Sequence, residues 1–132
     1  MSKVSSLFLV DDDIDDQDVF IDVLKEVNSA ITCITAFDGE EALAILKKSL
    51  PQVPDYIFLD LNMQRMNGTQ FLKALKSTEI LKNIPVIVYT TSSSLKDKEE
   101  MTSLGAAYFL TKPNSLAGLR TELEQVLFNG IV

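Results

Sequence analysis

Apolar residues along the chain gather in five short runs, separated by segments with helical spacing. The runs are 7–10, 31–36, 56–59, 86–89 and 107–110. Four of them are nearly continuous in apolar character, which is typical of strands covered on both faces. The second run alternates in polarity and favours the edge of a sheet, with Cys33 as a small buried hydrophobe on it.

Between the runs, apolar residues recur three and four positions apart, as on one face of a helix. The spacing is most regular in the last segment, at Leu116, Leu119, Leu123, Val126 and Leu127. The segment 95–104 is the weakest helix, because charged residues cover a thin apolar face. Capping residues start two segments: Asp38 precedes Glu41, and Ser94 precedes Asp97, each by three positions. Five strand–helix alternations predict an α/β fold of the (βα)5 type, with one parallel sheet sandwiched by helices.

Composition narrows the chemistry that this fold can carry. The 132 residues fit one domain. The absence of histidine excludes a Ser-His-Asp or Cys-His catalytic site and a His-ligated metal, and the single cysteine excludes a disulfide framework. A net charge of −7 disfavours nucleic acid as a direct partner. Without a signal-peptide core or a membrane-span pattern, a cytoplasmic protein with no membrane contact is expected.

Polar side chains stand where the predicted strands end. In chain order they are Asp11, Asp12, Asp13, Asp60, Thr90, Thr91, Thr111 and Lys112. The carboxyl ends of parallel strands share one rim, where ligands bind. Carboxylates that lie close together repel one another unless they share a cation, and a hard ion such as Mg²⁺ takes oxygen ligands. A carboxylate beside Mg²⁺ can attack a phosphoryl group, while a lysine and a threonine stabilise the transferred oxygens.

Four segments together resemble the receiver domain of two-component response regulators. They are SLFLVDDD (6–13), DYIFLDLNM (55–63) with MNG (66–68), PVIVYTT (85–91) and GAAYFLTKP (105–113). The resemblance covers about residues 5–128 of one domain, 1–132. It implies a doubly wound, five-stranded parallel sheet of order 2-1-3-4-5, a flavodoxin-like three-layer sandwich. The stretch TTSSS (90–94) further resembles single-domain regulators that are partnered with phytochrome-type kinases.

The resemblance also implies roles for the matched residues. Asp60 would accept a phosphoryl group from a sensor histidine kinase or a histidine phosphotransfer protein. Mg²⁺ would be held by Asp11, Asp12, Asp60 and the backbone carbonyl of Asn62. The other matched positions are Thr90 and Lys112 (phosphoryl binding), Phe109 (switch aromatic), Pro113 (after a cis bond), and Asn62 and Ser92 (dephosphorylation).

One position departs from the family pattern. Receivers usually carry proline four residues after the phosphoacceptor, and here Gln64 occupies that place. Proline would stiffen the loop and remove a donor, so glutamine is expected to change loop mobility or partner contacts without abolishing the site.

The leading hypothesis is a stand-alone receiver that catalyses only its own phosphorylation and dephosphorylation. Its output would be contact with a downstream protein, or with a second copy, through the face of helix 95–104, strand 107–110 and helix 116–127. Two other functions stay open: a phosphatase of the haloacid-dehalogenase kind, with Asp11 as nucleophile and Asp13 as acid/base, and an interaction module that needs no phosphate. A calcium loop is excluded, because its sixth and twelfth positions hold aspartate. The remaining acids of this stretch, Asp15, Asp16, Asp18 and Asp22, are interpreted as a solvated helix start.

Overall fold

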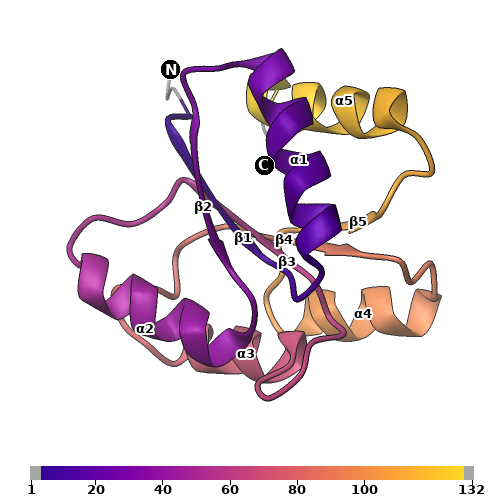
Figure 1. The fold of residues 1–132 in the computed structure, drawn as a ribbon. Helices are drawn as coiled ribbons and strands as arrows, with labels where there is room; N and C mark the ends of the chain where they lie inside the picture. Colours follow the sequence, from indigo (N-terminus) through magenta and orange to yellow (C-terminus); the bar gives the residue numbers. More distant parts are fainter. Residues whose placement is uncertain (1–3, 130–132) are drawn as a thin grey trace.

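A five-stranded parallel sheet in the order β2-β1-β3-β4-β5 forms the middle layer of the molecule (Figure 1). The computed structural model describes residues 4–129. The strands are β1 (Ser6–Val10), β2 (Thr32–Ala36), β3 (Tyr56–Leu59), β4 (Val86–Thr90) and β5 (Tyr108–Thr111). The helices are α1 (Ile14–Val27), α2 (Gly39–Ser49), α3 (Gly68–Lys76), α4 (Leu95–Ser103) and α5 (Leu116–Glu124), which runs into the π-helical turn η1 (Gln125–Asn129). The expected (βα)5 alternation and strand order are confirmed.

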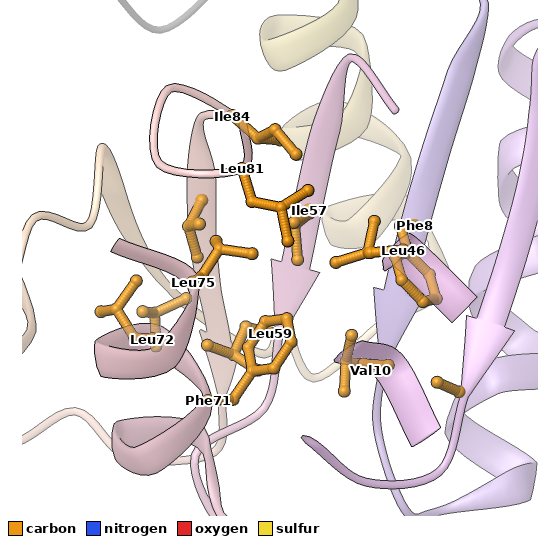
Figure 2. Close-up of a cluster of buried hydrophobic side chains, with 14 of the residues drawn as sticks. Phe8, Val10, Leu46, Ile57, Leu59, Phe71, Leu72, Leu75, Leu81 and Ile84 are labelled. Atoms are coloured by element: carbon orange, nitrogen blue, oxygen red, sulfur yellow. The ribbon is translucent and has the colours of Figure 1, made fainter. Parts of the chain in front are cut away.

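Two apolar cores lie on opposite faces of this sheet. Helices α1 and α5 cover one face, while α2, α3 and α4 cover the other (Figure 1). Successive residues of β1 point to opposite faces, so Phe8 enters one core and Leu9 the other. Figure 2 shows the core on the side of α2 and α3, where Leu46 and Phe71 meet side chains of the central strands. Because β1, β3 and β4 are buried on both faces, the ends of these strands are held rigidly.

The two edge strands are covered less completely. β2 alternates between exposed and partly buried positions, as expected, and Cys33 on it is only partly buried. β5 forms the other edge, as the expected strand order requires, but the expectation that it is covered on both faces is wrong: Tyr108 is 42% exposed. An edge strand has a neighbour on one side only, so part of its apolar surface stays open.

The helices begin where the sequence predicts. Asp38 accepts the backbone N–H of Glu41 at 2.9 Å, and Ser94 accepts that of Asp97 at 3.3 Å. The weakness of α4 is confirmed, because Met101 is its one buried residue. Among residues 4–129, none of the helices combines the length and apolar character required to span a bilayer.

Gly68, at the first turn of α3, lies directly against the strand end that carries the polar rim. A Cβ atom there would sit 2.6 Å from the carbonyl oxygen of Asp60 and 2.7 Å from Cα of Leu61. We expect Gly68→Ala to destabilise the protein by about 1–3 kcal/mol in urea unfolding, because backbone atoms have to shift. Gly118→Ala in the first turn of α5 is the matched control. There the nearest atoms belong to the side chains of Pro113 and Ser115, at 3.0 and 3.2 Å. A loss of stability in the control as large as that of Gly68→Ala would contradict this assignment.

Candidate functional site

The site is built on the ends of β1 and β3, which are neighbours in the sheet. Asp11 and Asp60 follow these strands directly, and the backbone N–H of Asp60 donates to the carbonyl of Val10 at 2.9 Å. One oxygen from each of Asp11, Asp12 and Asp60 lies within 4.8 Å of the others. Asp11 is fully buried and Asp60 is 7% exposed, whereas Asp12 is open to solvent. The structure therefore brings together the three carboxylates that the sequence places on one rim.

Lys112 crosses the rim from the end of β5. Its Nζ lies 2.8 Å from Oδ2 of Asp11, 2.8 Å from Oδ2 of Asp16 and 3.9 Å from Oδ2 of Asp60. The ammonium group also stands 5.4 Å from the centroid of the Tyr89 ring. One cation thus offsets the charge of three carboxylates, and its shortest contacts are not with Asp60.

Asp16 is the site residue that sequence reasoning missed. It was expected to be a solvated residue of the helix start, but it is the second close partner of Lys112. Helix α1 begins three residues after Asp11, so its first turn stands over the same rim. Which of the acids in that turn reaches the lysine depends on side-chain direction, which a run of similar residues does not reveal.

Burial and mutual repulsion raise the proton affinity of the two inner carboxyls. Burial, opposed by Lys112 and reinforced by Asp11, raises the pKa of Asp60 to about 6. Burial also raises the pKa of Asp11 above its usual range. Although burial alone would lower the pKa of Lys112, hydrogen bonds to Asp11 and Asp16 raise it. The three carboxylates carry more negative charge than Lys112 offsets, and they offer only oxygen ligands. Such a site fits a hard divalent cation such as Mg²⁺.

The loop after β4 links the rim to α4. Thr90 is fully buried, and its Oγ1 accepts the backbone N–H of Ser92 at 3.4 Å. The Ser92 hydroxyl donates to the Asp97 carboxylate of α4 at 2.7 Å, and its carbonyl accepts the Thr111 hydroxyl at 2.8 Å. Ser92 therefore joins the end of β4, the end of β5 and the start of α4.

Three further predicted residues have different outcomes. The expectation of a cis Lys112–Pro113 bond is wrong: within residues 4–129 the single cis peptide bond is Leu50–Pro51. A trans X–Pro bond is favoured by about 0.5–1 kcal/mol, and Lys112 makes its contacts from the trans chain. Phe109 is half-buried and packs against the core beneath α2, α3 and α4. The backbone amide of Asn62 lowers the pKa of the Asp60 carboxyl against burial, and the metal-ligand role of the Asn62 carbonyl stays a prediction.

Comparison with known proteins identifies the family. The family model "Response regulator receiver domain" matches residues 7–124. The chain belongs to the response regulator receiver domain family. Members of this family are phosphoacceptors in two-component signalling. It is a family of signalling domains and not a family of catalytic enzymes.

Individual relatives of this receiver differ in length. It is 35% identical over 121 residues to the transcriptional regulatory protein CiaR of Streptococcus pneumoniae, covering 92% of this chain and 50% of that one. It is 36% identical over 93 residues to protein PilG of Pseudomonas aeruginosa, covering 70% and 65%. The receiver thus spans about half to two thirds of these relatives.

Solved receiver structures cover the chain more completely. The phosphorylated cyanobacterial phytochrome response regulator RcpA has a TM-score of 0.86 at 28% identity, covering 99% of this chain and 98% of that one. The chemotaxis response regulator CheY4 of Vibrio cholerae has a TM-score of 0.78 at 32% identity, covering 95% and 100%. Both CheY-like and phytochrome response regulators are therefore structural neighbours.

The raised pKa of Asp60 predicts a pH dependence of stability in Mg²⁺-free buffer. Between about pH 4 and pH 6 native Asp60 holds a proton that the unfolded chain has released, so stability falls as the pH rises through this window. Asp60→Asn removes the buried charge. In urea unfolding at pH 7 we expect it to be more stable than the wild type by on the order of 1 kcal/mol, a value reduced for solvent screening.

At pH 4.5 most of this difference should disappear, because wild-type Asp60 is then largely protonated. Asp18→Asn, which removes an exposed carboxylate from α1, is the control and should not reproduce the pattern. Lower stability of Asp60→Asn at both pH values would show that burial of this charge is not unfavourable.

Proposed function

We propose that Asp60 is the phosphoacceptor of this receiver. The observation that carries the proposal is one buried carboxylate that has two further carboxylates within 4.8 Å and the Lys112 ammonium at 3.9 Å. An oxygen of Asp60 attacks the phosphorus of a phosphohistidine on the partner. The P–N bond breaks, its electron pair stays on the histidine nitrogen, and an acyl phosphate forms. An Asp60 with a pKa of about 6 is largely ionised at neutral pH, so no separate base is needed.

The surrounding residues orient and neutralise the transferred group. Asp11, Asp12, Asp60 and the Asn62 carbonyl would hold Mg²⁺, which when bound neutralises charge on the phosphoryl oxygens. Lys112 is held by Asp11 and Asp16, and we propose that it turns to the phosphoryl group once that group is in place. Asn62 and Ser92 would tune the rate at which water hydrolyses the acyl phosphate on Asp60. The protein would thereby catalyse its own phosphorylation and dephosphorylation.

We further propose that the phosphoryl group is read through Thr90 and Phe109. Attraction of the Thr90 hydroxyl to a phosphoryl oxygen would pull on Ser92, which bonds to Asp97 of α4. Phe109, half-buried on β5, would follow into the space that Thr90 leaves. Helix α4 is the part that moves, because one buried side chain attaches it to the core.

The partners of this switch follow from its chemistry. The phosphoryl donor would be a sensor histidine kinase or a histidine phosphotransfer protein, and the likeness to RcpA favours a phytochrome-type kinase. We propose that residues 5–128 act as one receiver domain in the cytoplasm. The output surface would be the α4–β5–α5 face, where Leu95 and Tyr108 are exposed, toward a downstream protein or a second copy.

Labelling with acetyl phosphate and Mg²⁺ tests the acceptor. We expect one acid-labile adduct on Asp60 by mass spectrometry, complete loss in Asp60→Asn, and at least about a tenfold slower reaction in Asp11→Asn. Asp13→Asn is the matched control: Asp13 caps α1 through the N–H groups of Asp15 and Asp16, and asparagine preserves a cap. An adduct on Asp11, or loss of reaction in Asp13→Asn, would instead support the phosphatase alternative.

Asp16 should restrain Lys112 before the phosphoryl group arrives. Asp16→Asn leaves the ammonium two carboxylate partners in place of three, so phosphorylation by acetyl phosphate should be about two- to tenfold faster. Asp18→Asn makes the same change in net charge on an exposed position of the same helix. Equal acceleration by both variants would assign the effect to overall charge and not to the contact with Lys112.

A further inference from the structure

The loop 61–67, between β3 and α3, holds an unusual backbone conformation. It follows Asp60 directly, and the backbone amide of Asn62 within it favours the ionised form of the Asp60 carboxyl, lowering its pKa against the larger effect of burial. The loop contains neither glycine nor proline. Yet Arg65 has a φ of 56°, and it is the single non-glycine residue with positive φ in the described part of the chain. In this region the Cβ atom crowds the backbone, so the conformation persists only where surrounding contacts impose it.

The contacts that impose it come from the start of α2. Nε of Arg65 donates to Oδ2 of Asp38 at 2.9 Å, and Nη2 forms an ion pair with the same oxygen at 2.7 Å. The other oxygen of Asp38 accepts the N–H of Glu41 and so caps α2. Asp38 is 5% exposed, and the Glu41 N–H together with the Arg65 guanidinium lowers the pKa of its carboxyl. The capping carboxylate is thus already fixed in place and offers its second oxygen to the loop.

The next residue of the loop is tied to the same helix end. The N–H of Gly39 donates to the carbonyl of Met66 at 3.0 Å. The approach is close enough that a Cβ at position 39 would lie 2.6 Å from Cγ of Met66. At the far end of the loop, the N–H of Gly68 donates a hydrogen bond to the carbonyl of Leu61 at 3.1 Å. The loop is therefore closed on itself and fastened to α2 by two consecutive residues.

We propose that Arg65 is a positioning residue for the phosphoacceptor loop. Its ion pair with Asp38 fastens the loop to α2 and thereby holds the Asn62 backbone in place beside the Asp60 carboxylate. Arg65 acts from outside the site: its side chain is 69% exposed, and within residues 4–129 it forms ion pairs only with Asp38 and Glu40. The inference rests on the proposed role of Asp60 as Mg²⁺ ligand and phosphoacceptor.

Three substitutions separate the contact from the backbone conformation and from the helix cap. Arg65→Ala removes the ion pair and keeps a side chain that resists positive φ. Arg65→Gly removes the ion pair and also relieves the conformation. Asp38→Ser keeps a good N-cap for α2 but is too short to hold the guanidinium. Arg120→Ala is the matched control, because Arg120 is also an exposed arginine paired with a carboxylate, Glu26 at 2.9 Å.

Mg²⁺ titration and hydrogen exchange of backbone amides, both followed by NMR in the full chain, measure the outcome. We expect Arg65→Ala and Asp38→Ser each to weaken Mg²⁺ binding by about three- to tenfold and to speed exchange of the Asn62 amide. The double variant should be no worse than either single one, since both remove the same contact. Arg65→Gly should bind Mg²⁺ as weakly as Arg65→Ala, but it should unfold at a higher urea concentration. Arg120→Ala should match the wild type.

The two hypotheses fail in different ways. Mg²⁺ affinity and Asn62 exchange within twofold of the wild type in both Arg65→Ala and Asp38→Ser would overturn the positioning role. Reduced stability with unchanged Mg²⁺ affinity and unchanged Asn62 exchange would overturn it as well, because that is the behaviour of a merely structural ion pair. A wild type that binds no Mg²⁺ would instead refute the proposed function, and Asn62 exchange would still decide whether Arg65 holds the loop.

Discussion

Confinement of like charges at the ends of two adjacent strands is the constraint on which the rest of the structure depends. Asp11 and Asp60 are buried side by side because β1 and β3 pair in parallel and end at the same level. Neither carboxylate can move away, since the residues behind each one are packed in the core on both faces of the sheet. The fold thus maintains an electrostatically unfavourable arrangement that protons, a cation or Lys112 can relieve. A site of this kind responds strongly to any change in charge.

Each loop around this rim is fastened to a different helix. Asp13, after β1, caps α1, and Arg65, after β3, is paired with Asp38 at the start of α2. Ser92, after β4, bonds to Asp97 of α4. The first two helices are anchored by several buried side chains, whereas α4 is anchored by one. When charge at the rim changes, the loops attached to α1 and α2 are therefore held firmly, whereas the loop attached to α4 can move more easily.

The sequence predicts those parts of the molecule in which buried residues form a regular apolar pattern. Most strands appear as unbroken apolar runs, and the residues at the carboxyl ends of parallel strands share a rim, so Asp11, Asp60, Thr90 and Lys112 could be found without coordinates. The pairing of Asp16 with Lys112 could not, because six aspartates stand between positions 11 and 18 and only side-chain direction tells them apart. The Arg65–Asp38 pair joins residues 27 positions apart, and neither residue carries a patterned signal for the other. The exposure of β5 follows from its place at the edge of the sheet, which the family resemblance implied but the continuous apolar run 107–110 did not.

The shallow attachment of α4 has an energetic meaning. Fully burying one methionine side chain is worth about 1.5–3 kcal/mol, so displacing α4 from the sheet forgoes little apolar burial. Burial raises the pKa of the Asp60 carboxyl to about 6, so its ionised form at the rim is less favourable than in water. Hydrogen bonds from Thr90 through Ser92 to Asp97 join the end of β4, at the same rim, to α4, so a change in charge at the rim bears on the helix that loses least apolar burial when it moves.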